Sequence, residues 1–279
     1  MKNPLLWLEL RIRIRERKLW VVSFLYLLCL LGMSFVPLLS TIDQPYAAPS
    51  QPADIGIAIF STSIFTLLAL LLIISPLSSA GAISQEREQR TLPGLLNTPL
   101  SSARIAFGKL LATWVFILWL IALSCPFLFL GMIWCGIAWW EVLTALGIIF
   151  AAGMLTSTVA LGLSGYFKRT ITSYLGTGTI FFLWFVVWPI IGGLTSSLEP
   201  QNDKAAQDRF LIFQFYTFWA HHPVAPLILA FQKELFEGSS PSPINATTAL
   251  FFALFIWLVV GIIFFLIACR GIRRALTDK

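Results

Sequence analysis

The stretch IGIAIFSTSIFTLLALLLIISPLSSAGAI, residues 55–83, contains no charged side chain. It is longer than the roughly 20 apolar residues that an α-helix needs to cross the hydrocarbon core of a bilayer. Its apolar residues are continuous, whereas a barrel strand would alternate apolar and polar positions. The stretch therefore predicts a membrane-spanning helix.

The composition of the whole chain agrees with this prediction. Of the 279 residues, 58% are hydrophobic, 14% aromatic and only 11% charged. An average soluble domain carries about a quarter charged residues, so this chain has too few to cover a water-exposed surface. The composition excludes a soluble enzyme, a disordered chain and a collagen-like fibre, and it indicates an integral membrane protein.

Six apolar runs are long enough to span a bilayer, and they predict an all-α polytopic fold. The runs cover residues 19–40, 55–83, 105–135, 142–167, 171–194 and 247–269. The second and third contain Pro76 and Pro126, where we expect a kink or a short extension beyond the membrane. The first run has too long an apolar core for a secretory signal peptide and no small-residue cleavage site, so we expect it to remain as the first helix.

The positions of the basic residues predict the orientation. With a cytoplasmic N-terminus, the outer segments hold only Lys204, Arg209 and Lys233, and the remaining sixteen of nineteen Lys and Arg lie on the inner side. The positive-inside rule therefore places both termini in the cytoplasm. Because the charges lie at the ends of apolar runs, the net charge of +6 does not indicate nucleic-acid binding.

Residues 195–246 are predicted to lie on the outer side. Within them, residues 210–231 resemble a seventh span, but His221, His222, Pro223 and Pro226 interrupt the run. A seventh crossing would also place the C-terminal arginines outside. We expect interfacial or re-entrant helices here, where aromatic side chains are common.

The N-terminal residues 1–18, MKNPLLWLELRIRIRERK, predict an amphipathic helix on the membrane surface. Asn3-Pro4 is a typical helix start, although residues 8–15 alternate as a strand would. The basic side chains could reach lipid phosphates, or they could serve only to set the topology. They are Arg11, Arg13, Arg15, Arg17 and Lys18.

The loop between the second and third runs, with its flanks, reads ISQEREQRTLPGLLNTPLSSARIAFGK, residues 83–109. A charged head is followed by Leu92, Leu95 and Leu96 and then by a turn at Asn97-Thr98-Pro99. A short helix of this kind, in a loop at 84–103, would suit a groove on a cytoplasmic partner. The alternative is an ordinary solvated loop.

With these features, the chain resembles permease subunits of the ABC type-2 transporter family. EREQRTLPGLLNTPLSSARIAFGK is similar to the signature cytoplasmic loop of that family, and NPLLWLELRIRIRERK is similar to its amphipathic connecting helix. Two departures stand out. Arg90 occupies a position where glycine is common, and Pro93-Gly94 replaces the more usual Glu-Leu, which could break the helix in the loop.

The resemblance implies a role for several segments. Residues 86–96 would form the coupling helix that docks on an ATPase, and residues 3–18 the connecting helix. Two ATPase copies would bind ATP and Mg²⁺, and a second permease half would complete a homodimer or heterodimer. The coupling residues would be Glu86, Arg87, Glu88, Arg90, Thr91, Leu92, Leu95 and Leu96. Spans two and five would line the substrate path with Ser61, Thr62, Ser63, Thr66, Thr177 and Thr179, although helix packing explains these residues equally well.

The sequence also excludes several kinds of chemistry. Gly108-Lys109 is not a P-loop, because Ala103 and Leu110 stand where that motif needs Gly and Ser or Thr. The spans carry no interior carboxylates, which argues against ion-coupled transport. No motif for hydrolysis is present, and the adjacent His221 and His222 do not form a metal-binding pair.

These observations predict a non-catalytic permease subunit of an ABC exporter in the inner (plasma) membrane. The substrate is not specified by the sequence. The alternative is a membrane assembly or scaffold protein with no transport cycle. A lipid-modifying enzyme is disfavoured because no catalytic groups are visible.

Overall fold

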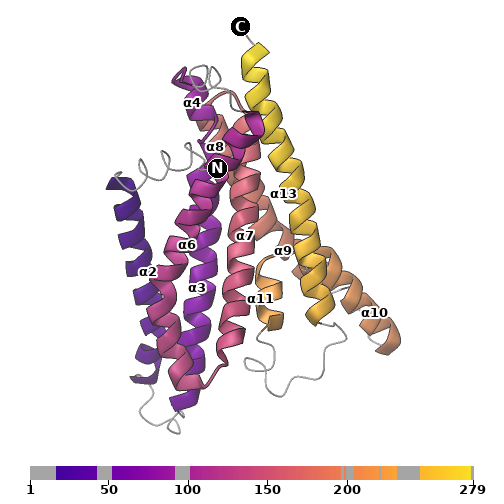
Figure 1. The fold of residues 1–279 in the computed structure, drawn as a ribbon. Helices are drawn as coiled ribbons and strands as arrows, with labels where there is room; N and C mark the ends of the chain where they lie inside the picture. Colours follow the sequence, from indigo (N-terminus) through magenta and orange to yellow (C-terminus); the bar gives the residue numbers. More distant parts are fainter. Residues whose placement is uncertain are drawn as a thin grey trace.

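The computed structural model describes residues 17–42, 52–91, 101–195, 198, 204–219, 221–230 and 246–277. Over these residues the protein is built of helices joined by short turns (Figure 1). The long helices are α2 (Arg17–Ile42), α3 (Pro52–Ala80), α6 (Ser102–Cys135), α7 (Trp139–Tyr166) and α13 (Ala246–Thr277). The shorter ones are α4 (Ser84–Glu88), α8 (Thr170–Phe182), η1 (Leu183–Val187), α9 (Trp188–Thr195), α10 (Lys204–Gln214), η3 (Phe215–Trp219) and α11 (Val224–Ala230).

Six helical segments in the described residues are long and apolar enough to span a membrane, as predicted. The fifth is composite, because α8, the π-helical turn η1 and α9 follow one another without a break from Thr170 to Thr195. Helices α3 and α6 run on through Pro76 and Pro126. The α2 helix begins at Arg17, and residues 1–16 lie outside the described residues.

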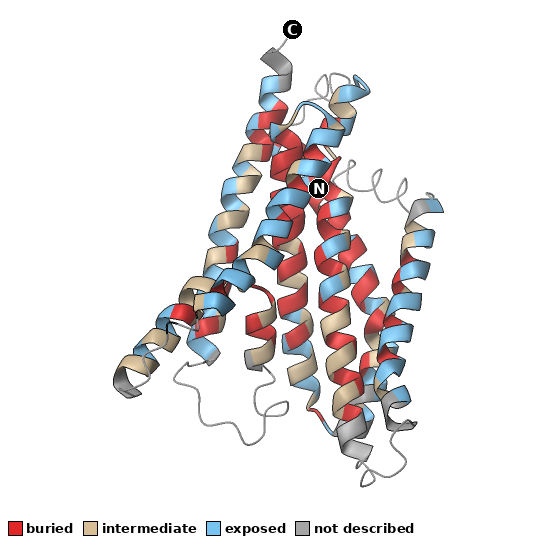
Figure 2. Ribbon diagram, turned by 180° about the vertical axis from the view of Figure 1, so that it is seen from behind, coloured by how far each residue is buried: buried red, intermediate tan, exposed pale blue. Residues whose placement is uncertain are grey.

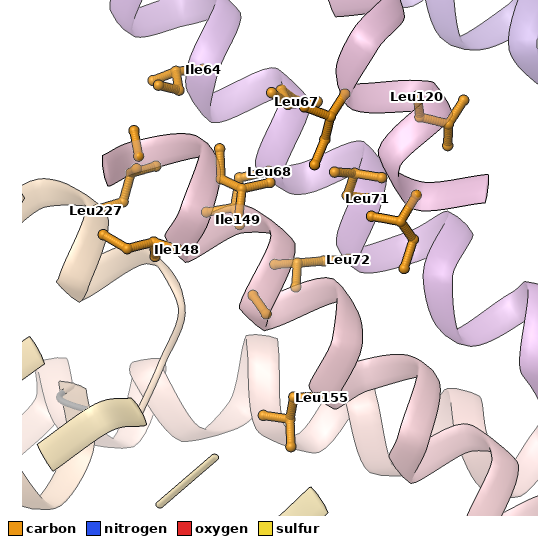
Figure 3. Packing of buried hydrophobic residues seen from close by; sticks show 14 of the residues in the cluster. Ile64, Leu67, Leu68, Leu71, Leu72, Leu120, Ile148, Ile149, Leu155 and Leu227 are labelled. Carbon is orange, nitrogen blue, oxygen red and sulfur yellow. The ribbon is translucent and has the colours of Figure 1, made fainter. Parts of the chain in front are cut away.

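Helices α3, α6 and α7 form the centre of the bundle, and α2 packs on one side of them. Figure 3 shows leucines and isoleucines of these helices interdigitating, including Leu68 of α3, Leu120 of α6 and Ile149 of α7. Of the six spans, α7 is the most buried. This central position suits its small residues Ala152 and Gly153, which allow close helix approach.

The peripheral helices expose their apolar side chains. Figure 2 shows exposed residues along α2 and α13, whereas buried residues gather in the centre of the bundle. Phe24 of α2 and Phe255 of α13 are both about two-thirds exposed, at 65% and 66%. In water such surfaces would cause aggregation, so they are the surfaces expected to face lipid or another protein.

The predicted outer segment contributes both to the bundle and to its edge. The short helix α11 contacts α7 and α13, and Leu227 is fully buried beside Ile148 and Ile149 (Figure 3). In contrast, α10 projects away from the bundle (Figure 1). Gln214 at its end donates to the carbonyl oxygen of Gly192 at 2.6 Å, which ties this segment to α9.

Candidate functional site

The short helix α4 lies at the end of the bundle where the C-terminal end of α13 is also found (Figure 1). The connection between α3 and α4 is held by hydrogen bonds to side chains of α7 and α8. The backbone N–H groups of Ile83 and Ser84 both donate to Oγ of Ser164 at 3.0 Å, and Ser173 Oγ donates to the carbonyl oxygen of Ala80 at 2.5 Å. The chain therefore leaves α3 in one fixed direction, and α4 is positioned by its neighbours.

Glu86 of α4 forms an ion pair with Lys109 of α6. The Glu86 Oε1 and Lys109 Nζ atoms are 2.6 Å apart, and the lysine side chain is only 5% exposed. A buried ammonium group needs a paired carboxylate, because the loss of hydration is otherwise uncompensated. The pair therefore links α4 to the first turns of the third span.

Arg87 links α4 to two other helices. Its Nη1 donates to the carbonyl oxygen of Phe167 at 3.1 Å, and its Nη2 donates to those of Gly165 at 3.3 Å and Gly271 at 2.9 Å. The first two carbonyls belong to the C-terminal end of α7 and the residue after it, and the third belongs to α13. The forked guanidinium group suits this arrangement, since it presents several donors in a fixed plane.

The opposite side of this segment is open. Gln85, Glu88, Gln89, Arg90 and Thr91 are exposed. Glu88 Oε2 accepts a hydrogen bond from Thr170 Oγ1 at 2.6 Å, so this carboxylate is oriented by the start of α8. The exposed residues form a polar surface with both charge signs. We call it the outer face of α4, meaning the face turned away from the helix bundle and not the outer side of the membrane.

The helix is shorter than predicted. We expected one helix over residues 86–96, but α4 ends at Glu88 and Arg90 adopts φ = 56°. This left-handed conformation is the one that glycine takes most readily, and it does not continue the helix. The chain thus turns at Arg90, before Pro93-Gly94, which lies outside the described residues.

The other predicted coupling and connecting residues are distributed as follows. Glu86 and Arg87 face the bundle, whereas Glu88, Arg90 and Thr91 lie on the outer face of α4. Arg17 is exposed at the start of α2. Leu92, Leu95, Leu96, Arg11, Arg13 and Arg15 lie outside the described residues, as does the side chain of Lys18.

The predicted path residues differ in burial and in hydrogen-bond partners. Ser63 is fully buried between helices, with its Oγ atom 2.8 Å from Oγ of Ser34 on α2. Thr177 is also buried, whereas Thr179 is exposed on α8 and donates to its own helix at Leu175. Ser61 likewise donates to its own helix, and Thr62 and Thr66 are partly exposed. For Ser63 the structure therefore shows a packing role between α2 and α3.

Sequence reasoning missed the partners of α4, among them Lys109, Ser164 and Gly271. Lys109 is one of the sixteen inner-side basic residues, but it lies inside the apolar run that begins at Ile105. A lysine inside such a run is costly without a partner, and this signal could have identified it. Ser164 and Gly271 carry no comparable signal, because serine and glycine are common in packed spans.

Comparison with known proteins gives one family. The family model described as "ABC-2 family transporter protein" matches residues 4–268, which is nearly the whole chain. No curated protein matches the sequence significantly.

Proposed function

The chain belongs to the ABC-2 transporter family, and we propose that it is the permease subunit of an ATP-driven exporter whose ATPase docks on the outer face of α4. It is a multi-pass membrane protein with six apolar helices. In the proposed complex it lies in the inner (plasma) membrane with both termini in the cytoplasm, as its basic residues favour. A second permease half, identical or not, completes the pathway.

The main support for the proposal is that one side of α4 is bonded to the helix bundle, whereas its outer face is open. On the inner side, Glu86 is paired with Lys109 of α6, and Arg87 is bonded to carbonyls of α7 and α13. On the outer face, Glu88, Arg90 and their neighbours are available to a partner. A loop that served only as a connection would not need such anchoring.

Because of this anchoring, a displacement of α4 would move several spans together. A charged group at a close-packed helix end cannot move without its partners, because separation would leave buried charge unpaired. Force applied to the outer face would therefore be transmitted to α6, α7 and α13. In the proposed cycle, closure of the ATPase subunits supplies that force and repacks the spans around the substrate.

The ATPase subunits, two per complex, would bind ATP and Mg²⁺, since the chain itself has no P-loop. The permease contributes the path and the docking surface and carries out no chemical step. Its cargo is an unidentified substrate that is moved outward in the proposed cycle.

The proposal is tested by purifying the tagged chain from its native membranes in mild detergent and identifying stoichiometric partners by mass spectrometry. We expect a P-loop ATPase to co-purify with the wild-type chain. The double variant Glu88→Lys/Arg90→Glu should lose most of it, because both charges of the outer face are reversed.

Arg209→Glu on α10 is the matched control, because Arg209 is an exposed residue on a helix far from α4. This variant should retain the ATPase. Retention of the ATPase by the Glu88→Lys/Arg90→Glu variant would reject the docking site. Isolation of the wild-type chain with only non-ATPase partners would instead support an assembly or scaffold role.

A further inference from the structure

A small pocket of about 260 Å³ lies between the C-terminal end of α7, α13 and Arg87 of α4. Four of its lining residues are cationic: Arg87, Lys168, Arg270 and Arg274. None of the eight lining residues, all within the described part of the chain, is acidic. A pocket lined by four cationic residues and, among its described lining, no carboxylate is electrostatically suited to an anion.

The residue types indicate which anion. Arginine binds phosphate oxygens through paired, charge-assisted hydrogen bonds, and three of the four cations are arginines. Arg87 is held in position by the carbonyl oxygens of Gly165, Phe167 and Gly271. The Nη atoms of Arg87 are thus used within the protein, and this residue contributes a fixed positive charge to the pocket.

A close backbone contact between α7 and α13 positions the basic residues of the pocket. Gly165 and Gly271 both line the pocket, and their helices touch there. A Cβ atom at Gly165 would lie 3.0 Å from Cα of Ala268, and one at Gly271 would collide with the carbonyl of Gly165. The close contact of α7 and α13 thus keeps Arg270 and Arg274 near Arg87.

The other wall of the pocket is apolar. It contains Tyr166, which is 64% exposed, and Ile267 of α13. Ile263 and Leu266, about half exposed, extend the apolar surface of α13 along the span. A site that is basic at the helix ends and apolar along the span matches an amphiphile, with its phosphate in the pocket and its chains on the span.

We propose that this pocket binds the phosphate group of an anionic phospholipid. Free phosphate shares the charge but would gain nothing from the apolar wall. The site lies beside the proposed ATPase-docking face and does not depend on that proposal. Bound lipid would hold the ends of α7 and α13 together.

The test uses the full chain purified in detergent and depleted of lipid, with binding measured by titration. The probes are dioctanoyl phosphatidylglycerol, phosphatidylcholine of the same chain length and inorganic phosphate. Phosphatidylglycerol should bind most tightly. In Arg270→Gln/Arg274→Gln, its affinity should fall about 30-fold, because each cation near a lipid surface contributes roughly a fivefold effect.

Arg104→Gln is the matched control, because Arg104 is an exposed arginine of α6 that does not line the pocket. Its affinity for phosphatidylglycerol should stay within about twofold of wild type. Thermal melting in the same detergent checks that each variant is folded, and the two variants alter only exposed side chains.

Three outcomes would overturn the proposal. Equal loss in the pocket variant and the Arg104→Gln control would show a general effect of charge rather than a site. Inorganic phosphate binding as tightly as phosphatidylglycerol, and at the same residues, would assign the pocket to a free phosphate compound. Unchanged lipid binding in the pocket variant, with loss of ATPase co-purification, would assign the pocket to the protein partner.

Discussion

Oε1 of Glu86 on α4 lies 2.6 Å from Nζ of Lys109 on α6, and this lysine is almost completely buried. The two residues are 23 positions apart, on either side of the cytoplasmic loop of the proposed topology. The pair closes that loop at its base. The sequence suggested that Glu86 would meet a partner protein, but its carboxylate is used within the permease.

Removing one member of this ion pair should destabilise the protein more than removing both. Glu86→Gln leaves the buried ammonium of Lys109 without its carboxylate, and Lys109→Met leaves an unpaired carboxylate. Each single variant should lose about 3 kcal/mol of stability. Glu86→Gln/Lys109→Met should recover a large part of that loss, because neither charge remains. Thermal melting of the four proteins in one detergent measures the coupling, and additive losses would show that the two charges do not interact.

Arg87 should not tolerate replacement by lysine. Lysine keeps the charge but lacks the planar fork that reaches the carbonyl oxygens of Gly165, Phe167 and Gly271. Arg87→Lys should therefore lose about 2 kcal/mol of stability. The exposed Arg104→Lys should leave the melting temperature unchanged. Equal melting of the Arg87→Lys variant and the wild-type chain would mean that charge alone holds α4.

Glycine should be required at position 271 but not at 261 of the same helix. A Cβ atom at Gly271 would collide with backbone atoms of Gly165, whereas one at Gly261 would have nothing within 4 Å. Gly271→Ala should separate α7 from α13 and destabilise the protein by about 1–3 kcal/mol. Gly261→Ala should be neutral or slightly stabilising, because alanine favours helix. If the two variants melt alike, the close helix contact does not exist in the membrane protein.

The packing of α11 should weaken in acid. Burial lowers the pKa of His222 to about 4, and burial also lowers the pKa of His221. His222 is neutral in the folded protein while an unfolded histidine takes up a proton near pH 6.5, so stability should fall as the pH drops from about 6.5 toward 4. The full loss from His222 amounts to about 3 kcal/mol.

His222→Gln should flatten most of this pH dependence, because glutamine does not titrate. Melting curves recorded between pH 7 and pH 4 measure it. Parallel curves for the variant and the wild-type chain would assign the acid sensitivity to other groups.

The membrane spans were predictable because each depends only on consecutive residues of the sequence. A helix that crosses a bilayer must be apolar over about 20 consecutive residues, whatever its neighbours are. Residues 55–83 meet this condition alone, and the structure has α3 there. The likeness of the loop at 83–109 to a family motif was also readable, and the family match extends over residues 4–268.

The direction in which each loop residue faces was not predictable. Neighbouring residues on one short helix point different ways, and their partners are remote: Arg87 bonds to Gly271, 184 positions away. Helix α4 also ended earlier than expected, because the chain turns at Arg90 in the left-handed conformation. Few signals in a single sequence mark arginine for such a position, since the conformation favours glycine.

The sequence by itself therefore determined the membrane class, the six spans and the family, since these depend on local hydropathy and on a contiguous motif. Only the tertiary structure decided which charges of the loop are internal, which are open to a partner, and that Arg87, Arg270 and Arg274 surround one pocket. The physical reason is that these relationships arise from the packing of α7 against α13, and residues far apart in the chain meet only when the helices are assembled.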